Sequence, residues 1–139
     1  MRNIVTDSGI PTEEGQPWSA GALQDGLHFN GPIRYLTIDG AKIRSGDDGF
    51  ALNANDAGTD DMGTDNEMGP YVSQGLITDV AVSNLQCMGA DSGIRLLSSN
   101  QRIDRVVINN VTGTIQSYLA IIRIPVAAIL VQSFSTIST

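Results

Sequence analysis

The chain has 139 residues, a formal net charge of −7 and a sequence pI of about 4.3. A negative surface gains nothing from contact with nucleic acid or an anionic membrane, so neither is expected as a partner. Hydrophobic residues make up 41% of the chain but aromatic ones only 5%, so the core must come from aliphatic side chains. Together with 15 glycines, this composition favours strands joined by turns. We expect one all-β domain over residues 1–139.

The first segment, residues 1–22, is expected to be irregular or to form only part of a repeat. Pro11, Gly15, Pro17 and Gly21 interrupt it at short intervals. The N-terminal residues contain no apolar signal-peptide core, so no secretion signal is expected in this chain.

Residues 23–55 hold two copies of one pattern, in which a turn residue and a glycine precede an alternating strand. The copies are Asp25–Phe29 and Asp48–Leu52, and the interval between their starts defines one period. The next segment, residues 56–70, is dense in Gly, Asp, Thr and Asn and predicts an inserted loop. Its acidic residues lack the spacing of an EF-hand, so an acidic solvated loop is expected and no metal site.

Both this pattern and a second one recur in residues 71–139. Ser92–Leu96 follows the second copy after one period plus the inserted loop, and Ser117–Ile121 is a weaker copy about one period later. The second pattern alternates apolar and polar residues around a central Asn, Asp or Gly. It occurs at Leu36–Ile43, Val80–Cys87 and Val106–Gly113, and the starts of the last two are again separated by about one period.

The C-terminal part is the most apolar region of the chain. Leu119–Val131 contains Arg123 and Pro125, and it is too short and too interrupted to span a bilayer, so buried strands are expected. Cys87 has neither a second cysteine to pair with nor metal-ligand spacing around it. We expect it to be a small buried apolar residue.

A period in the low to middle twenties without any helical pattern predicts a β-solenoid of few coils. A leucine-rich repeat would need a dense leucine signature, and a β-sandwich would not repeat both patterns in order. Equivalent apolar residues should stack between coils. The expected columns are Ile38, Val82 and Ile108, and Phe50, Ile94 and Leu119.

Acidic residues concentrate where the two patterns meet. Asp47 and Asp48 are adjacent, and Asp25 occupies the position that matches Asp48 one coil earlier. If the register holds, three carboxylates converge on one face, and their repulsion raises at least one pKa. Arg95, which matches Ala51 a coil later, should lie on the same wall. The alternative is structural, because aspartates at turns bind backbone amides without any catalytic role.

These segments resemble the polygalacturonase family of glycoside hydrolases. That family carries Asn-Thr-Asp-Gly, Gly-Asp-Asp-Cys-Ile-Ala, Gly-His-Gly and Arg-Ile-Lys in that order on a pectin-lyase-like β-helix. The similar segments here are Gln24–Gly26, Ser45–Leu52 and Gly93–Leu97, and the resemblance spans about half of the chain. The sugar-processing domains of phage tailspikes and neck appendages share this architecture. The resemblance therefore implies a right-handed parallel β-helix of few coils, a short stretch or a fragment of a longer helix.

The resemblance implies inverting hydrolysis of a glycan by an aspartate trio. Asp47 would be the general acid that protonates the leaving oxygen, while Asp25 and Asp48 would orient and deprotonate the attacking water. It also implies a homotrimer located in a virion tail or outside the cell, with a polysaccharide or cell-surface glycan as its partner and no cofactor. The residues expected to contact substrate are Arg95, His28 and Asn53.

Two departures from the family pattern bear on the substrate. Met88–Asp91 stands in place of Gly-His-Gly, and Leu97 stands in place of the lysine. Both losses weaken the expected binding of an anionic galacturonide at the reacting subsite, which favours a neutral or differently substituted glycan. They also leave open a module that binds glycan, or spaces other domains, without turnover. A designed solenoid is a third alternative, although it would have more regular repeats.

Overall fold

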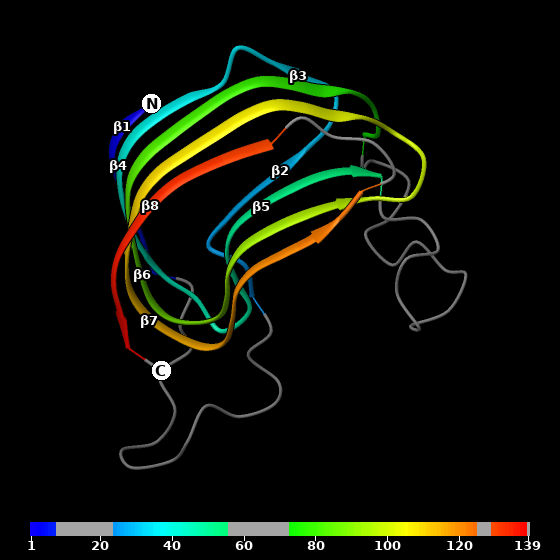
Figure 1. Ribbon diagram of the computed structural model, residues 1–139. Coiled ribbons are helices and arrows are strands. Elements are labelled where there is room, and N and C mark those ends of the chain that lie inside the picture. The colour runs from blue at the N-terminus through cyan, green and yellow to red at the C-terminus, as the bar shows by residue number, and fades with distance from the viewer. Residues whose placement is uncertain (8–23, 56–72, 125–128, 139) are drawn as a thin grey trace.

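The computed structural model describes residues 1–7, 24–55, 73–124 and 129–138, which contain strands, turns and bends (Figure 1). Within this part of the chain there is no helix, so none is long and apolar enough to cross a membrane. The expected all-β class is therefore confirmed. The strands are β1 (Arg2–Asp7), β2 (Leu27–Asn30), β3 (Ile33–Arg34), β4 (Thr37–Arg44), β5 (Asp48–Asn55), β6 (Ile77–Ser98), β7 (Ile103–Arg123) and β8 (Ile129–Ser138).

The strands form one curled sheet in which every described pairing is parallel. One series runs β1–β4–β6–β7–β8 and a second runs β2–β5–β6–β7, while β3 pairs with β6. Because β6 and β7 are 22 and 21 residues long, they bend and belong to both series (Figure 1). Sequence segments that follow one another along the chain thus lie side by side.

The register of the sheet confirms the predicted spacings. Leu27 pairs with Phe50, Asp48 with Ser92, and Val80 with Val106. The partners in each pair are separated along the chain by the interval between successive copies of the corresponding sequence pattern. The two patterns therefore mark equivalent positions in neighbouring layers of backbone.

The predicted apolar columns form, with one correction. Ile38, Val82 and Ile108 are successive register partners and are fully buried. Phe50 faces Ile94, but the next partner is Ala120 and not Leu119. The alignment of the weak fourth copy was wrong by one position, because it placed Ser92 opposite Ser117, whereas Ser92 pairs with Tyr118. This is the same offset as in the pair Met88 and Thr114, since the two register shifts around Ala90 cancel.

One bend of the sheet stacks residues with positive φ. Asn3, Gly40, Asn84 and Asn110 have φ between 53° and 81° at matching register positions. Asparagine and glycine tolerate this left-handed conformation better than other residues do. The side chains also bond between layers: the Asn84 amide donates to Asp39 Oδ1 at 2.8 Å, and the Asn110 amide donates to Asn84 Oδ1 at 2.7 Å. This bend explains why the second sequence pattern has Asn, Asp or Gly at its centre.

A second bend also stacks residues with positive φ and links its layers through side-chain hydrogen bonds. Tyr35, Asp79 and Arg105 have φ of 60°, 58° and 49°, and each directly follows a set of register partners in β3, β6 and β7. The Arg105 guanidinium donates two hydrogen bonds to the Asp79 carboxylate, at 2.7 and 2.9 Å, and lowers its pKa. Bends at fixed register positions keep the layers aligned.

The remaining segment predictions have mixed outcomes. Within residues 1–22, Arg2–Asp7 form β1, which pairs with β4, while residues 8–22 lie outside the described part of the chain. The predicted loop 56–70 also lies outside it. The apolar C-terminal region contributes to β7 and β8, as expected for strands. The expected burial is wrong for the end of β7, where Ile122 is exposed and the three residues before it are only partly buried. Cys87 is fully buried, and burial raises the pKa of its thiol to about 11, which fits an inert core residue.

The buried column predicts that shortening Ile108 costs more stability than shortening its neighbour Val107 in β7. Ile108→Ala should lower the free energy of unfolding by about 2–5 kcal/mol, because it leaves a cavity in the buried column. Val107→Ala, on the partly exposed side of the same strand, should cost no more than about 1 kcal/mol. Urea denaturation measures both. Equal losses would mean that β7 is not held in this register.

Gly113 should tolerate no side chain. Its φ is +129°, and a Cβ there would lie 1.7 Å from the Cys87 carbonyl oxygen, so Gly113→Ala should destabilise the fold by about 3 kcal/mol or prevent folding. Gly40→Ala is the matched control: its φ is +81°, but the Cβ would lie 3.0 Å from a movable side-chain atom, Asn3 Oδ1. We expect a loss of only about 1–2 kcal/mol there, measured as a shift in thermal midpoint.

Candidate functional site

Three carboxylates meet where β2 and β5 begin. Asp25 precedes β2, Asp47 ends the turn after β4, and Asp48 is the first residue of β5. The Gly26 amide donates to the Asp48 carbonyl at 2.8 Å, and the Asp48 amide donates to Asp25 Oδ1 at 3.0 Å. One oxygen from each of the three carboxylates lies within 4.8 Å of the others. The register therefore brings Asp25 to the pair, as the repeat of the sequence pattern predicted.

Asp48 is the most buried member of the trio. Its side chain is 2% exposed, Oδ1 has no hydrogen-bond partner, and Oδ2 lies 3.3 Å from a guanidinium nitrogen of Arg95. Burial and then the Asp25 charge raise the pKa of Asp48 to about 7, while Arg95 opposes the rise. The expected raised pKa is present on Asp48, whereas the resemblance makes Asp47 the general acid.

His28 contacts the carboxylates directly. Its Nδ1 bonds with Asp25 Oδ2, and its other ring nitrogen, Nε2, is buried without a hydrogen-bond partner. The bond to Asp25 raises the pKa of His28 despite partial burial of the ring. His28 was predicted from the sequence to contact glycan, yet its nearest partner is a member of the trio.

The other two expected substrate contacts also lie among protein groups. Arg95 pairs in register with Ala51, as predicted. On its other side Ala51 pairs with His28, so this small residue lies between Arg95 and His28. Asn53 is 2% exposed and lies between Asn30 and Leu97 in register. In this arrangement Arg95 and His28 support the carboxylates, and Asn53 belongs to the packed sheet.

Asp91 is a neighbouring carboxylate that sequence reasoning did not select. Its amide donates to the Asp47 carbonyl at 2.8 Å, and its Oδ1 accepts a hydrogen bond from the Ser117 hydroxyl. Asp91 stands directly before Ser92, just as Asp47 stands directly before Asp48, the register partner of Ser92. This matching position was the sequence signal that could have identified Asp91. The resemblance instead implies a histidine in this segment.

The trio is also the described group with the composition of a metal site. Carboxylate oxygens suit Ca²⁺ or Mg²⁺, which bind ionised ligands. Here the Arg95 guanidinium already pairs with Asp48 Oδ2, so a cation of the protein itself neutralises part of the charge of the group.

Comparison with known proteins adds no further assignment. No protein-family model matches the chain, and no curated protein or solved structure gives a significant match. The candidate site is therefore defined by its geometry.

The two raised pKa values predict that stability falls as pH rises. Asp48 and His28 both bind protons more tightly in the folded state, so the unfolded state binds fewer protons in this range and stability is lost with increasing pH. We expect the free energy of unfolding to drop by about 1–3 kcal/mol between pH 5 and pH 8. Asp48→Asn should flatten that dependence, and Asp79→Asn should not. A profile that Asp48→Asn leaves unchanged would contradict the burial of this carboxyl.

Proposed function

We propose that this chain is a stretch of right-handed parallel β-helix that binds a polysaccharide and hydrolyses its glycosidic bonds at the Asp25–Asp47–Asp48 trio. The observation that carries the proposal is the meeting of three carboxylates from successive layers within 4.8 Å, beside an arginine. Support for the fold comes from the all-parallel pairing, whose register follows the intervals of the sequence repeat.

Acid–base chemistry on a glycosidic bond needs one protonated and one ionised carboxyl. The trio can hold a proton near neutral pH, because burial and the neighbouring Asp25 charge raise the pKa of Asp48 to about 7. Asp47 is less buried than Asp48, so in this proposal it passes the proton to the leaving oxygen. Asp25 and Asp48 then carry the negative charge that orients the attacking water.

The spacing of the trio bears on stereochemistry. Inverting enzymes hold their two carboxyl groups about 6.5–9.5 Å apart so that a water fits between them. The closest oxygens here lie within 4.8 Å, so an attacking water would lie beside the trio and not between its members. The resemblance to polygalacturonases favours inversion, and NMR detection of the first anomer released distinguishes inversion from retention.

The proposal also includes an oligomeric state and a location. We propose a tailspike-like homotrimer in a virion tail or outside the cell, with a surface glycan as its ligand. Open edges of a parallel sheet need to be covered, and trimer formation would cover them. Light scattering of the purified chain tests the trimer independently of any glycan.

A second candidate function is glycan adhesion without turnover. It is favoured by the way the carboxylates are used inside the fold: Asp25 accepts bonds from His28 and from the Asp48 amide, and Asp48 pairs with Arg95. Such contacts stabilise a bend between layers without any chemistry. The two candidates differ in one measurable property, the release of reducing ends.

Asp47→Asn distinguishes them. For an enzyme, reducing-end release from capsular, teichoic-acid and pectic polymers should fall by about 10²–10⁴-fold in the variant, because general acid catalysis is lost. Binding of the same polymer should persist. Asp79→Asn is the control: it also removes one carboxylate, and asparagine is tolerated at its φ of 58°.

Two results would contradict this proposal. Wild-type protein that binds a polymer without releasing reducing ends would establish adhesion. Equal activity of Asp47→Asn and wild type would remove the trio from the mechanism even if hydrolysis occurs.

A further inference from the structure

The C-terminal part of β7 is the last strand of its series. Within the described chain, β8 pairs with β7 only as far as the register pair Thr114 and Ser138, and no described strand lies beyond Ile115–Ile122 (Figure 1). One row of backbone N–H and C=O groups in this segment therefore faces outward from the described sheet. An open strand edge of this kind can pair with a strand of another chain.

The apolar interior is also uncovered at this edge. Tyr118 and Ile122 are the register partners of Ser92 and Leu96 in β6. Those partners are 1% and 0% exposed, whereas Tyr118 is 60% exposed and Ile122 is 47% exposed. Ala120, which lies between them, is only partly buried. The interior columns thus continue into β7, where no further described layer covers them.

The backbone direction shows which groups form the edge. The Leu119 carbonyl oxygen points toward β6, because it would lie 2.9 Å from a Cβ placed on Gly93. Backbone groups alternate in direction along a strand, so those of Tyr118, Ala120 and Ile122 point to the outer side. The same three residues hold the uncovered side chains.

This edge is complementary to itself. Rotation of a second copy about a two-fold axis at Ala120 makes the two edges antiparallel, with Ala120 opposite itself and Tyr118 opposite Ile122 of the second copy. Residues opposite each other in such hydrogen-bonded pairs exchange both of their backbone hydrogen bonds. Aromatic and β-branched side chains also form favourable cross-strand pairs. The uncovered ends of the two interiors then meet.

The charges near this edge suit a second copy. A chain of net charge −7 repels its own kind, but Ile115–Ile122 carries no charge, and the next residue is the cation Arg123. In the two-fold arrangement Arg123 lies opposite Ser117 of the second copy, and the Ser117 hydroxyl donates to the Asp91 carboxylate. A guanidinium has five N–H donors, so Arg123 can approach this carboxylate in addition to the contacts within its own chain.

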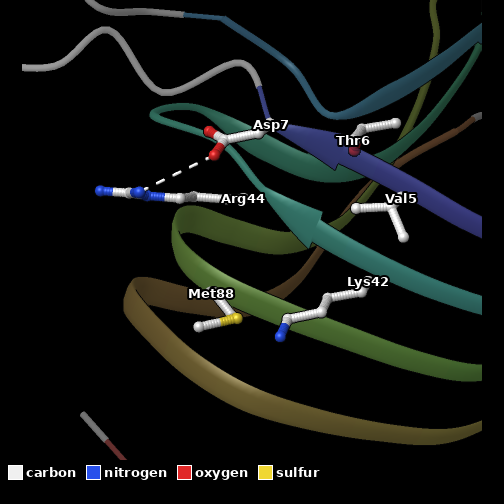
Figure 2. Close-up of a pocket in the computed structure, with 6 residues that line it drawn as sticks. All are labelled: Val5, Thr6, Asp7, Lys42, Arg44 and Met88. Carbon is white, nitrogen blue, oxygen red and sulfur yellow. Dashed lines mark ion pairs between the residues drawn. The ribbon is translucent and has the colours of Figure 1, made fainter.

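The outer edge of β1 lacks this complementarity. β1 is also an edge strand of the described sheet, but it carries Arg2 and Asp7. Figure 2 shows the Asp7 carboxylate beside the Arg44 guanidinium of β4, with 3.8 Å between the paired atoms. Charged side chains on an edge oppose pairing with another strand. The β7 edge is therefore the better surface for a second copy.

We propose that Tyr118–Ile122 of β7 is an interface between two copies of this chain, which pair antiparallel about a two-fold axis and join the open ends of their interiors. The inference goes beyond the proposed function, because Asp48 pairs with Ser92 and Ser92 with Tyr118, so the interface lies two layers from the trio. Assemblies formed through it contain an even number of chains: two, or six where two of the proposed trimers join.

The native mass tests the interface. Sedimentation velocity over about a hundredfold range of protein concentration should show wild-type assemblies of two or six chains. Ile122→Lys should leave one or three, with self-association weakened at least about a hundredfold, because each pair of chains contains the buried ammonium twice. Val5→Lys is the matched control: Val5 is a 75% exposed residue of β1, and its substitution should leave the mass unchanged.

A cysteine at the two-fold axis tests the register. In Ala120→Cys, the two cysteines of a pair lie opposite each other with Cα atoms about 5.5 Å apart, which is within disulfide range, so mild oxidation should link the chains. Ile121→Cys is the control, because Ile121 lies opposite Leu119 of the second copy and its side chain leaves the other face. The native Cys87 is buried in both variants and should not react.

The outcomes separate this inference from the proposed function. Wild-type protein with a mass of one or three chains at every concentration would overturn the interface, and so would equal cross-linking of Ala120→Cys and Ile121→Cys. Even-numbered assemblies that release no reducing ends would uphold the interface and count only against hydrolysis. Hydrolysis by a protein that never forms such assemblies would reject the interface alone.

Discussion

Parallel hydrogen bonding between successive layers of backbone is the constraint on which the other features of this protein depend. Each described layer lies directly against the next at an interval of the sequence repeat, and a shift of one position would move every side chain to the opposite face of the sheet. The register therefore fixes three things together: the aliphatic columns inside, the left-handed bends, and the carboxylates from different layers.

The bends show how local conformation supports the register. Asn84 can adopt positive φ because its short polar side chain tolerates that region, and the same side chain bonds Asp39 in one layer and Asn110 in the other. Backbone preference and hydrogen bonding between layers thus favour the same alignment. Gly113 works differently, since the close approach of the Cys87 carbonyl leaves no space for a Cβ.

The candidate site contains a group whose ionisation destabilises the folded sheet. A buried carboxylate next to two others is unfavourable when ionised, and its pKa of about 7 expresses that cost. Arg95 offsets part of it, and the Asp25–His28 contact holds the neighbouring charge in place. Burial and the neighbouring negative charges are thus the two factors that raise the pKa of this carboxyl.

Sequence periodicity by itself determined the all-β class, the pairing of the repeated segments in β2, β4, β5, β6 and β7, and the convergence of Asp25 with Asp47 and Asp48. Alternating apolar residues and turn residues recur there at the intervals that the layers adopt. It failed by one residue at Leu119, because the weak fourth copy offers no glycine to fix its alignment and the true partner of Ile94 is Ala120. Only the tertiary structure decided which carboxyl has a raised pKa, namely Asp48, and that His28 contacts Asp25. Burial depth and side-chain direction depend on neighbours distant in the sequence, and spacing along one chain does not record them.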